Sequence, residues 1–518
     1  MKRYKATFAG RIVLFAVIIA IAIGGVIGVR HLMPSNSDTK NETTQVANVN
    51  KSIGKNEDKK PTTTKKEDIT INLSLDEWIG WEPILYANGD YETKDGSIFD
   101  NLGLNVKIHI INDADSSSNA LIKGDLNAAG YTLNRTAFLS GKFVDAGLDI
   151  VMPVFTNYSD GGDGIIAMSN IESVEELVGA KIGVPKFSEA QSLVVWFVNK
   201  SDLTEEQKQN IINNLVLLDD AEQTGQAFFA GSLDVAATWQ PYLSYAEDST
   251  DSHILFDTSS SNKLILDGIV FRKDFAEAHP DVVSKFIEGI FIALEEYESD
   301  FDTIKKMMPM FAGMADEDIA VTRLDAGMMG YAANIKALKN DCATIYNDMC
   351  DVWESIGETV NRSIVDTLFD TSYVEALSDK FSTLEVVQTV TITEEQKEAA
   401  LDVPSMLTKS CTIEFIPDTA KFKDAAVANE ILMEFVEIAK VLDGTIIQVE
   451  GNLHFDGNKY SGDALSTSRA EAVKKFLVAN GIDANRIIAI GNGNSKMIDG
   501  ATSQQNRRTD VFFKTVGA

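Results

Sequence analysis

Cysteine and histidine are scarce in this chain of 518 residues, and motifs of catalysis are missing. The three cysteines (Cys342, Cys350 and Cys411) and the five histidines have no spacing typical of a metal site. Cys342 and Cys350 suit either a disulfide or two free buried thiols. No GxSxG, HExxH or Walker pattern occurs. We therefore expect no metal, no cofactor and no catalytic residue, which favours binding over catalysis.

Basic residues are also few relative to acidic ones. Lys and Arg number 46 against 77 Asp and Glu, for a net charge of -31. Nucleic-acid partners require basic patches, so this balance argues against one. Hydrophobic residues make up 44% of the chain, enough for real cores, and the length predicts two to four domains.

The amino terminus is typical of a membrane anchor. Residues 1–11 are basic, and Ile12–Val29 contain no charge. As a helix this run spans about 27 Å, close to the hydrocarbon thickness of a bilayer. The basic flank is expected in the cytoplasm and the rest of the chain outside it. A cleaved signal peptide is the alternative, but no small-x-small site follows, so an uncleaved single-pass anchor is favoured.

Composition and pattern divide the remaining chain. Residues 30–68 are polar and predict a disordered linker. Residues 69–380 alternate short apolar runs with helical patterns, which predicts a mostly parallel α/β fold, and from Asp274 onward the pattern is helical. Residues 381–410 read as a second linker. Residues 411–518 predict a small α+β domain that begins with a strand at TIEFI.

Residues 69–380 resemble the extracytoplasmic solute-binding proteins of ABC importers, in the branch that binds sulfonates, taurine, nitrate and thiamine precursors. The motifs that carry the resemblance follow one another in order: EWIGWEPILYA, LIKGDLNAAG, YSDGGDGIIA, AFFAGSLDVAATWQPYLS, GIVFRKDFAEAHPDVV and LFDTSYVEAL. The resemblance implies a bilobed, periplasmic-binding-protein-like fold. Its two lobes would close by a hinge motion on a small-molecule solute.

The same resemblance implies which residues line the cleft. They are Trp78, Trp81, Ser159, Asp160, Gly162, Asp163, Ser188 and Trp239. Structural roles stay open for several of them. Trp78 and Trp81 could equally pack at the hinge, and Trp239 could occupy a core position. Asp163 could accept hydrogen bonds from backbone amides of its own loop. Aromatic faces beside carboxylates suit a cationic or amide-bearing ligand.

The tail resembles the OmpA-like peptidoglycan-binding domain. The matching segments are IEFIPDTAKF, EGNLHFDG, LSTSRAEAV and QQNRRTDVFF. In that family an aspartate and an arginine hold the diaminopimelate of the stem peptide. The resemblance implies a peptidoglycan site that contains Asp418, His454, Asp456, Arg469 and Arg507.

His454 stands where the family has its aspartate, and histidine is a poor partner for an ammonium group. Three interpretations stay open. Asp456 or Asp463 supplies the carboxylate from a shifted loop, the wall ligand has a different stem, or the domain serves as a scaffold. Retained or altered wall binding is favoured.

Together these features predict a membrane-anchored receptor that captures a solute for an ABC permease and holds to peptidoglycan through its tail. The alternative is an envelope scaffold or adaptor that keeps the binding fold without transport. A stator-like flagellar protein also joins one membrane helix to an OmpA-like tail. That interpretation requires a carboxylate in the membrane span, and none is present.

Overall fold

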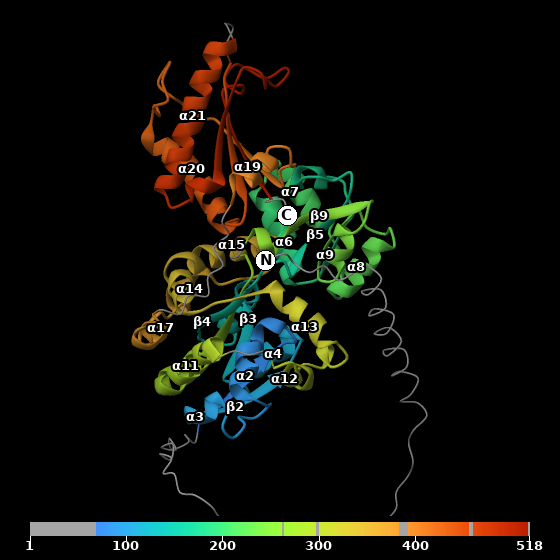
Figure 1. Cartoon of the computed structure of the whole chain (residues 1–518), viewed down its shortest axis with the longest axis vertical. Helices are drawn as coiled ribbons and strands as arrows, with labels where there is room; N and C mark the ends of the chain where they lie inside the picture. Colours follow the sequence, from blue (N-terminus) through green and yellow to red (C-terminus); the bar gives the residue numbers. More distant parts are fainter. Residues whose placement is uncertain (1–68, 262–263, 297–299, 383–391, 455–458, 516–518) are drawn as a thin grey trace, which may run out of the picture. The chain divides into compact units, whose positions relative to one another are not determined.

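The computed structural model describes residues 69–261, 264–296, 300–382, 392–454 and 459–515 (Figure 1). The expected basic flank 1–11, membrane span 12–29 and linker 30–68 lie outside these ranges, as does Asp456. None of the helices within the described ranges is long and apolar enough to cross a bilayer. The described residues belong to one compact unit, Lys66–Ala518.

The first sheet has six strands in the order β11-β4-β10-β3-β1-β2. Their bounds are Thr70–Leu75 (β1), Asn105–Ile110 (β2), Ala128–Thr132 (β3), Ile150–Ser159 (β4), Leu266–Arg272 (β10) and Ala326–Met328 (β11). β1 is parallel to β2 and β3, whereas β10 is antiparallel to β3 and β4. β4 reads IVMPVFTNYS and is buried at every position but one, as expected of a strand covered on both faces.

The second sheet has five strands in the order β7-β6-β8-β5-β9. Their bounds are Asp163–Met168 (β5), Ile182–Pro185 (β6), Val216–Leu218 (β7), Val235–Trp239 (β8) and Ser252–Asp257 (β9). β5 is antiparallel to both of its neighbours, β8 and β9. The chain passes from β4 of the first sheet into β5 of the second, and returns from β9 into β10. Each sheet therefore contains a reversed strand that arrives from the other lobe.

Helices follow most strands of the two sheets. In the first half of the body they are α2 (Glu82–Asn88), α3 (Ile98–Asn101), α4 (Ala114–Lys123), α5 (Leu133–Asp145), α6 (Glu189–Lys200), α7 (Glu205–Asn213), α8 (Ala221–Phe229) and α9 (Tyr242–Glu247). Thr132 and Ser188 cap α5 and α6 by accepting backbone N–H bonds. The two sheets, their helices and the two crossings between them confirm the bilobed α/β fold predicted from the sequence.

The segment after β10 is helical apart from β11, as predicted. It contains α10 (Lys273–Ala278), α11 (Pro280–Glu296), α12 (Phe301–Met307), α13 (Asp316–Thr322), α14 (Tyr331–Lys336), α15 (Cys342–Ser355), α16 (Val365–Leu368), α17 (Ser372–Glu375) and α18 (Ser378–Phe381). Helix α15 packs against both α5 and α6. All three cysteines are free thiols.

The tail has a four-stranded sheet in the order β12-β15-β13-β14. After α19 (Glu394–Ala400) come β12 (Leu407–Cys411), α20 (Ala425–Val441), β13 (Ile446–Asn452), α21 (Lys459–Ala479), β14 (Ile487–Gly493) and β15 (Thr509–Lys514). The strand expected at TIEFI is wrong, because β12 ends at Cys411 and Phe415 forms only an isolated bridge with Phe422. The residues after Cys411 leave the sheet and line a cavity instead.

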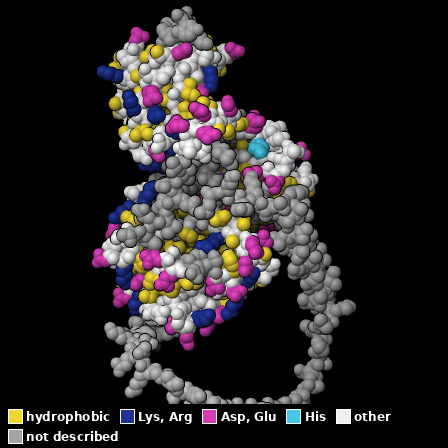
Figure 2. Space-filling view, viewed as in Figure 1, with side chains coloured by type: hydrophobic (Ala, Val, Ile, Leu, Met, Phe, Trp, Pro, Cys, Tyr) yellow, Lys and Arg dark blue, Asp and Glu magenta, His cyan; other side chains and the backbone are white. Residues whose placement is uncertain are grey.

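Charged side chains of both signs lie on the described surface that Figure 2 shows. On the face in Figure 2, Lys and Arg side chains lie interspersed among the Asp and Glu side chains. On that face the excess of acidic side chains is therefore spread among basic ones. The candidate sites consist of buried charges instead.

Candidate functional site

Polar residues lie at the strand ends of both sheets. Asp76 directly follows β1, and Thr132 is the last residue of β3. Asp267 in β10 is the register partner of Thr132, so it lies at the same edge. In the second sheet, Asp163 begins β5 and Glu189 begins α6 after β6. Ligands of open α/β sheets bind beyond such strand ends, which makes these residues the candidate site.

An ion pair joins the two lobes at this site. Arg135 donates from Nη2 to Glu189 Oε2 at 2.8 Å and from Nε to Oε1 at 3.1 Å, while Thr132 Oγ1 donates to Oε1 at 2.8 Å. The two charged side chains are 18% and 14% exposed. Burial raises the pKa of Glu189, but Arg135, a backbone hydrogen bond and the bond from Thr132 together outweigh burial, so the net pKa is lowered. Burial likewise opposes the charge of Arg135, whose pKa is nevertheless raised by Glu189 and Asp76.

Asp163 lies where the chain crosses between the lobes. Ser159 Oγ donates to Asp163 Oδ2 at 2.7 Å and lies 2.8 Å from Thr258 Oγ1 on the second crossing. The Gly161 N–H also donates to Thr258 Oγ1, at 2.9 Å. Burial raises the pKa of Asp163 to about 7, although the bond from Ser159 opposes the rise. Carboxyls with perturbed pKa values gather at functional sites, so this crossing is part of the candidate site.

Two further buried carboxyls come from the first sheet. Asp76 accepts a hydrogen bond from Trp81 Nε1 at 2.6 Å. Burial raises the pKa of Asp76 despite the opposing effects of Arg135 and Trp81. Asp267 is 4% exposed. Burial raises its pKa well above the ordinary value, and the charges of Asp76, Glu189 and Asp163 raise it further.

The tryptophans predicted to line the cleft are anchored beside these acids. Trp81 is 1% exposed and belongs to the core, with its indole N–H on Asp76. Trp78 donates from Nε1 to Asn157 Oδ1 at 2.8 Å. A Cβ on Gly162 would lie 3.1 Å from Trp78 Cη2, so Gly162 permits this close approach. The structure therefore places Trp78 between the crossing segment and the first sheet.

The other predicted residues have mixed surroundings. Ser188 caps α6 and donates from Oγ to the Pro185 carbonyl at 2.7 Å, so its hydroxyl serves the turn. The Asp160 N–H donates to the Asp325 carbonyl at 2.8 Å. Trp239 is 42% exposed at the end of β8, where it is the register partner of Asp163. Of the eight predicted residues, Ser159 and Asp163 contact each other directly in the crossing segment.

Sequence reasoning missed four charged residues of this cluster: Asp76, Arg135, Glu189 and Asp267. A signal existed for two of them, since Asp76 directly follows the buried run INLSL and Glu189 follows the predicted Ser188. Arg135 sits within a helix and Asp267 within a strand, where a single charge is normally read as solvent-facing. Their burial depends on tertiary contacts.

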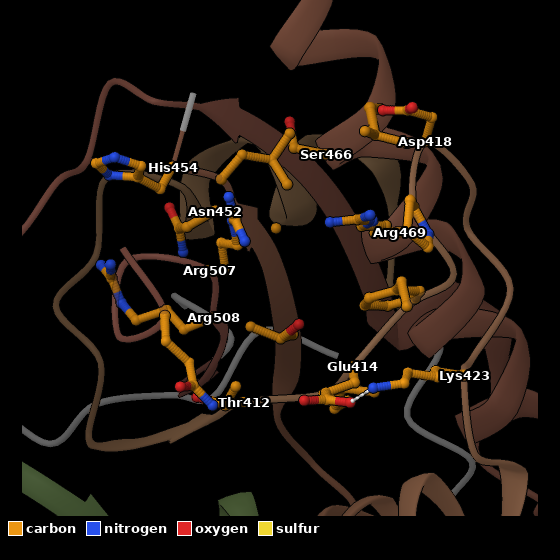
Figure 3. Close-up of a pocket in the computed structure, with 18 residues that line it drawn as sticks. Thr412, Glu414, Asp418, Lys423, Asn452, His454, Ser466, Arg469, Arg507 and Arg508 are labelled. Atoms are coloured by element: carbon orange, nitrogen blue, oxygen red, sulfur yellow. Dashed lines mark hydrogen bonds and ion pairs between the residues drawn. The ribbon is translucent and has the colours of Figure 1, made fainter. Parts of the chain in front are cut away.

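The tail contains a separate cavity of about 540 Å³ (Figure 3). The loop after β12, the end of β13, the start of α21 and the segment before β15 line it. Its polar and charged lining includes Thr412, Glu414, Asp418, Lys423, Asn452, His454, Ser466, Arg469, Gln504, Arg507, Arg508 and Thr509. Four of the five predicted wall-binding residues thus surround one cavity, and the fifth, Asp456, lies outside the described residues.

Arg469 is held in place beside this cavity. Its guanidinium carbon lies 4.7 Å from the centre of the Phe415 ring, and its Nε donates to the Thr419 carbonyl at 3.1 Å. Burial lowers the pKa of Arg469, and the charge of Arg507 lowers it further, whereas Asp418 opposes the shift. Within the described part of the chain, no ion pair neutralises Arg469 or Arg507. The two guanidinium groups can therefore hold an anionic group.

The remaining charges near the cavity are mostly compensated. Arg508 Nε lies 3.0 Å from Asp510 Oδ2, and Lys423 pairs with Glu414 at 2.5 Å. His454 lines the cavity at the end of the described segment. Asp463 lies on α21 against Gly493 and is not among the described residues that line the cavity. One proposed substitute for the family aspartate is therefore turned toward β14.

Comparison with known proteins supports the predicted resemblance of the tail. Residues 415–510 match the family model described as OmpA family. Curated protein sequences contain no match to the chain.

Among solved structures, the chain is similar to the periplasmic aliphatic sulphonate binding protein SsuA from Escherichia coli, at 16% identity and TM-score 0.44 over 59% of this chain and 99% of that one. It is also similar to the periplasmic nitrate-binding protein NrtA from Synechocystis, at 10% identity and TM-score 0.43 over 62% and 91% of the two chains. A third similar structure is the alkanesulfonate-binding protein SsuA from Xanthomonas axonopodis pv. citri, at 15% identity and TM-score 0.41 over 58% of this chain and 99% of that one. At these identities and TM-scores the likeness carries no conclusion about what this chain binds.

Proposed function

We propose that this protein is an extracytoplasmic receptor that binds a small-molecule solute between its two α/β lobes and does not catalyse a reaction. The observation that carries the proposal is the buried cluster of ionisable side chains at the facing strand ends. Keeping several carboxyls out of water is costly unless they interact with a partner. A fold that keeps them at its ligand-binding edge is best explained by a ligand that uses them.

In this proposal the tail holds the receptor to peptidoglycan. The support is the OmpA family match together with a cavity in which Arg469 and Arg507 face an unfilled space. A guanidinium fork suits the carboxylate end of a stem peptide. The uncharged run at Ile12–Val29 would anchor the chain in the membrane, and an ABC permease would receive the solute.

The receptor proposal is tested by ligand-induced stabilisation of the full-length protein. Amines, amino acids, sulfonates and pyrimidines would be screened for a rise in Tm, and hits confirmed by calorimetry. A true ligand at a hundred times its Kd stabilises the fold by about 2.7 kcal/mol. Binding should be lost in Asp163→Ala and kept in Asp125→Ala, which removes an exposed acid outside the site.

One observation favours the scaffold alternative. Arg135 and Glu189 pair directly across the lobes, so side chains of the protein itself occupy part of the space between them. If this ion pair holds the two lobes together permanently, no compound in the screen will raise Tm. In that case Arg135→Met would destabilise the protein without creating or removing any ligand response.

The wall proposal is tested by cosedimentation of the full-length protein with purified sacculi. Arg469→Ala should reduce the bound fraction severalfold, because it removes a half-buried guanidinium that lines the cavity. Lys475→Ala on the same helix, an exposed position, removes the same charge and should bind normally. Equal binding by both variants to sacculi of any stem chemistry would contradict wall binding through this cavity.

A further inference from the structure

Among the described residues, the interlobe site contains more carboxyls than cations. Its carboxyls are Asp76, Asp163, Glu189 and Asp267, and the cation coupled to them is Arg135. Arg135 forms a two-pronged pair with Glu189, and this pair uses both oxygens of that carboxylate. The hydrogen bonds to Asp76 and Asp163 come from neutral groups, an indole N–H and a hydroxyl. Among the described residues, Asp76, Asp163 and Asp267 therefore have no ionic partner of their own.

Asp267 gives the most specific indication of a missing partner. The residue is 4% exposed, and no residue in the described ranges donates a hydrogen bond to its carboxyl. Its register partners are Thr132 on β3 and Asn157 on β4, and paired residues of antiparallel strands point to the same face. Thr132 contacts Glu189 of the second lobe, and Asn157 contacts Trp78. The carboxyl of Asp267 is thus aimed into the space between the lobes.

A buried carboxyl without a donor loses its solvation and regains nothing from the protein. A ligand that donates hydrogen bonds and carries positive charge would replace the lost hydrogen bonds to water and would also stabilise the charge of the carboxylate. An anionic ligand would meet three carboxyls, and the nearby guanidinium is already paired with Glu189.

We propose that the solute is an organic cation with at least one ammonium or guanidinium group, and that Asp267 binds this group together with Asp76 or Asp163. The inference rests on the proposed receptor function and specifies the chemistry of its ligand. The indole of Trp78, held beside Asn157, supplies an apolar surface for the carbon skeleton of such a molecule.

The test is calorimetric titration of the full-length protein with putrescine, agmatine and choline as cationic probes. Butanesulfonate and nitrate serve as anionic probes, and calcium chloride as a metal probe. We expect saturable binding of at least one organic cation. Asp267→Asn should weaken that binding at least tenfold, whereas the exposed control Asp125→Asn should leave it unchanged.

The outcomes separate this inference from the receptor proposal. Binding of butanesulfonate, nitrate or calcium alone overturns the inference of an organic cation. If the bound probe is butanesulfonate or nitrate, the receptor proposal stands. No binding by any probe, together with silence in the wider solute screen, overturns both. Cation binding that survives Asp267→Asn, Asp76→Asn and Asp163→Asn also overturns the inference, because the site would lie elsewhere. If Asp267→Asn fails to fold, Asp76→Asn carries the same test.

Discussion

At the scale of single residues, Asp163 links the stability of the body to pH. Burial raises its pKa from 3.8 to about 7 in the folded protein. The unfolded chain therefore releases this proton at a lower pH than the folded protein does. The contribution of Asp163 to the free energy of unfolding is fully present below about pH 4 and is lost as the pH rises toward 7. Between about pH 4 and pH 7, the contribution of Asp163 to the free energy of unfolding falls by up to about 1.4 kcal/mol per pH unit. We expect Asp163→Asn to remove that loss.

The measurement is urea unfolding of the two proteins at several pH values between 4 and 8. Asp125→Asn is the control for removing an acid. The prediction fails if the wild type and Asp163→Asn show the same slope of unfolding free energy against pH.

We predict that His454 determines the ligand preference of the tail cavity. The cavity contains Arg469 and Arg507 without ion pairs in the described structure, and the family aspartate is replaced. His454→Asp would add an anion for an ammonium group. We expect it to strengthen binding of diaminopimelate-containing peptidoglycan about tenfold, a gain in the range of a charge-assisted hydrogen bond. Cosedimentation with sacculi of that type measures the change; unaltered binding would show that His454 does not contact the stem.

Some residues of the site were predictable and others were not. Ser159 and Asp163 flank a pair of glycines in a polar crossing, which marks a tight and accessible segment. The contact between Arg135 and Glu189 joins residues 54 apart in sequence, and each reads alone as a charge on a helix surface. Only the packing of α5 and α6 across the lobes buries them together.

At the scale of secondary-structure elements, Gly451 sets how closely α21 approaches β13. A Cβ at this position would lie 2.4 Å from the Ser466 carbonyl oxygen, which belongs to the helix backbone and cannot rotate away. We expect Gly451→Ala to destabilise the tail by about 2 kcal/mol, the usual cost of overpacking. Gly313→Ala is the matched control, because nothing lies within 4 Å of its added Cβ. Thermal unfolding of both variants tests this; an equal Tm would show that the helix shifts freely.

Element types followed the sequence pattern more reliably than element limits. The continuous apolar run of β4 predicts a strand buried on both faces, and that strand is present. The run TIEFI was wrongly read as a strand, since Phe415 packs against Phe422 and Arg469 rather than into the sheet. An apolar alternation does not distinguish a strand from a loop that lines a cavity.

At the scale of the whole molecule, the two sites consist of different residues and should act independently. The interlobe cluster belongs to residues 76–267, and the tail cavity to residues 412–509. We expect Asp267→Asn to leave binding to sacculi unchanged, and the double variant Arg469→Ala, Arg507→Ala to leave solute binding unchanged, because separated sites without shared partners give additive effects. Calorimetry and cosedimentation on the same preparations measure both. A change of more than threefold in the distant activity would reveal coupling.

The reversed strand of each sheet also orders events during synthesis on the ribosome. One edge of β3 stays open after residue 132 has emerged, because its neighbour β10 begins only at Leu266. At about 5–20 residues per second, translation of the intervening segment takes on the order of ten seconds. During that interval the nascent chain exposes an apolar strand edge, which is the kind of surface that pairs with other chains. The arrangement in which each sheet takes a strand from the other lobe thus also leaves the growing chain with an exposed strand edge until its first 272 residues are complete.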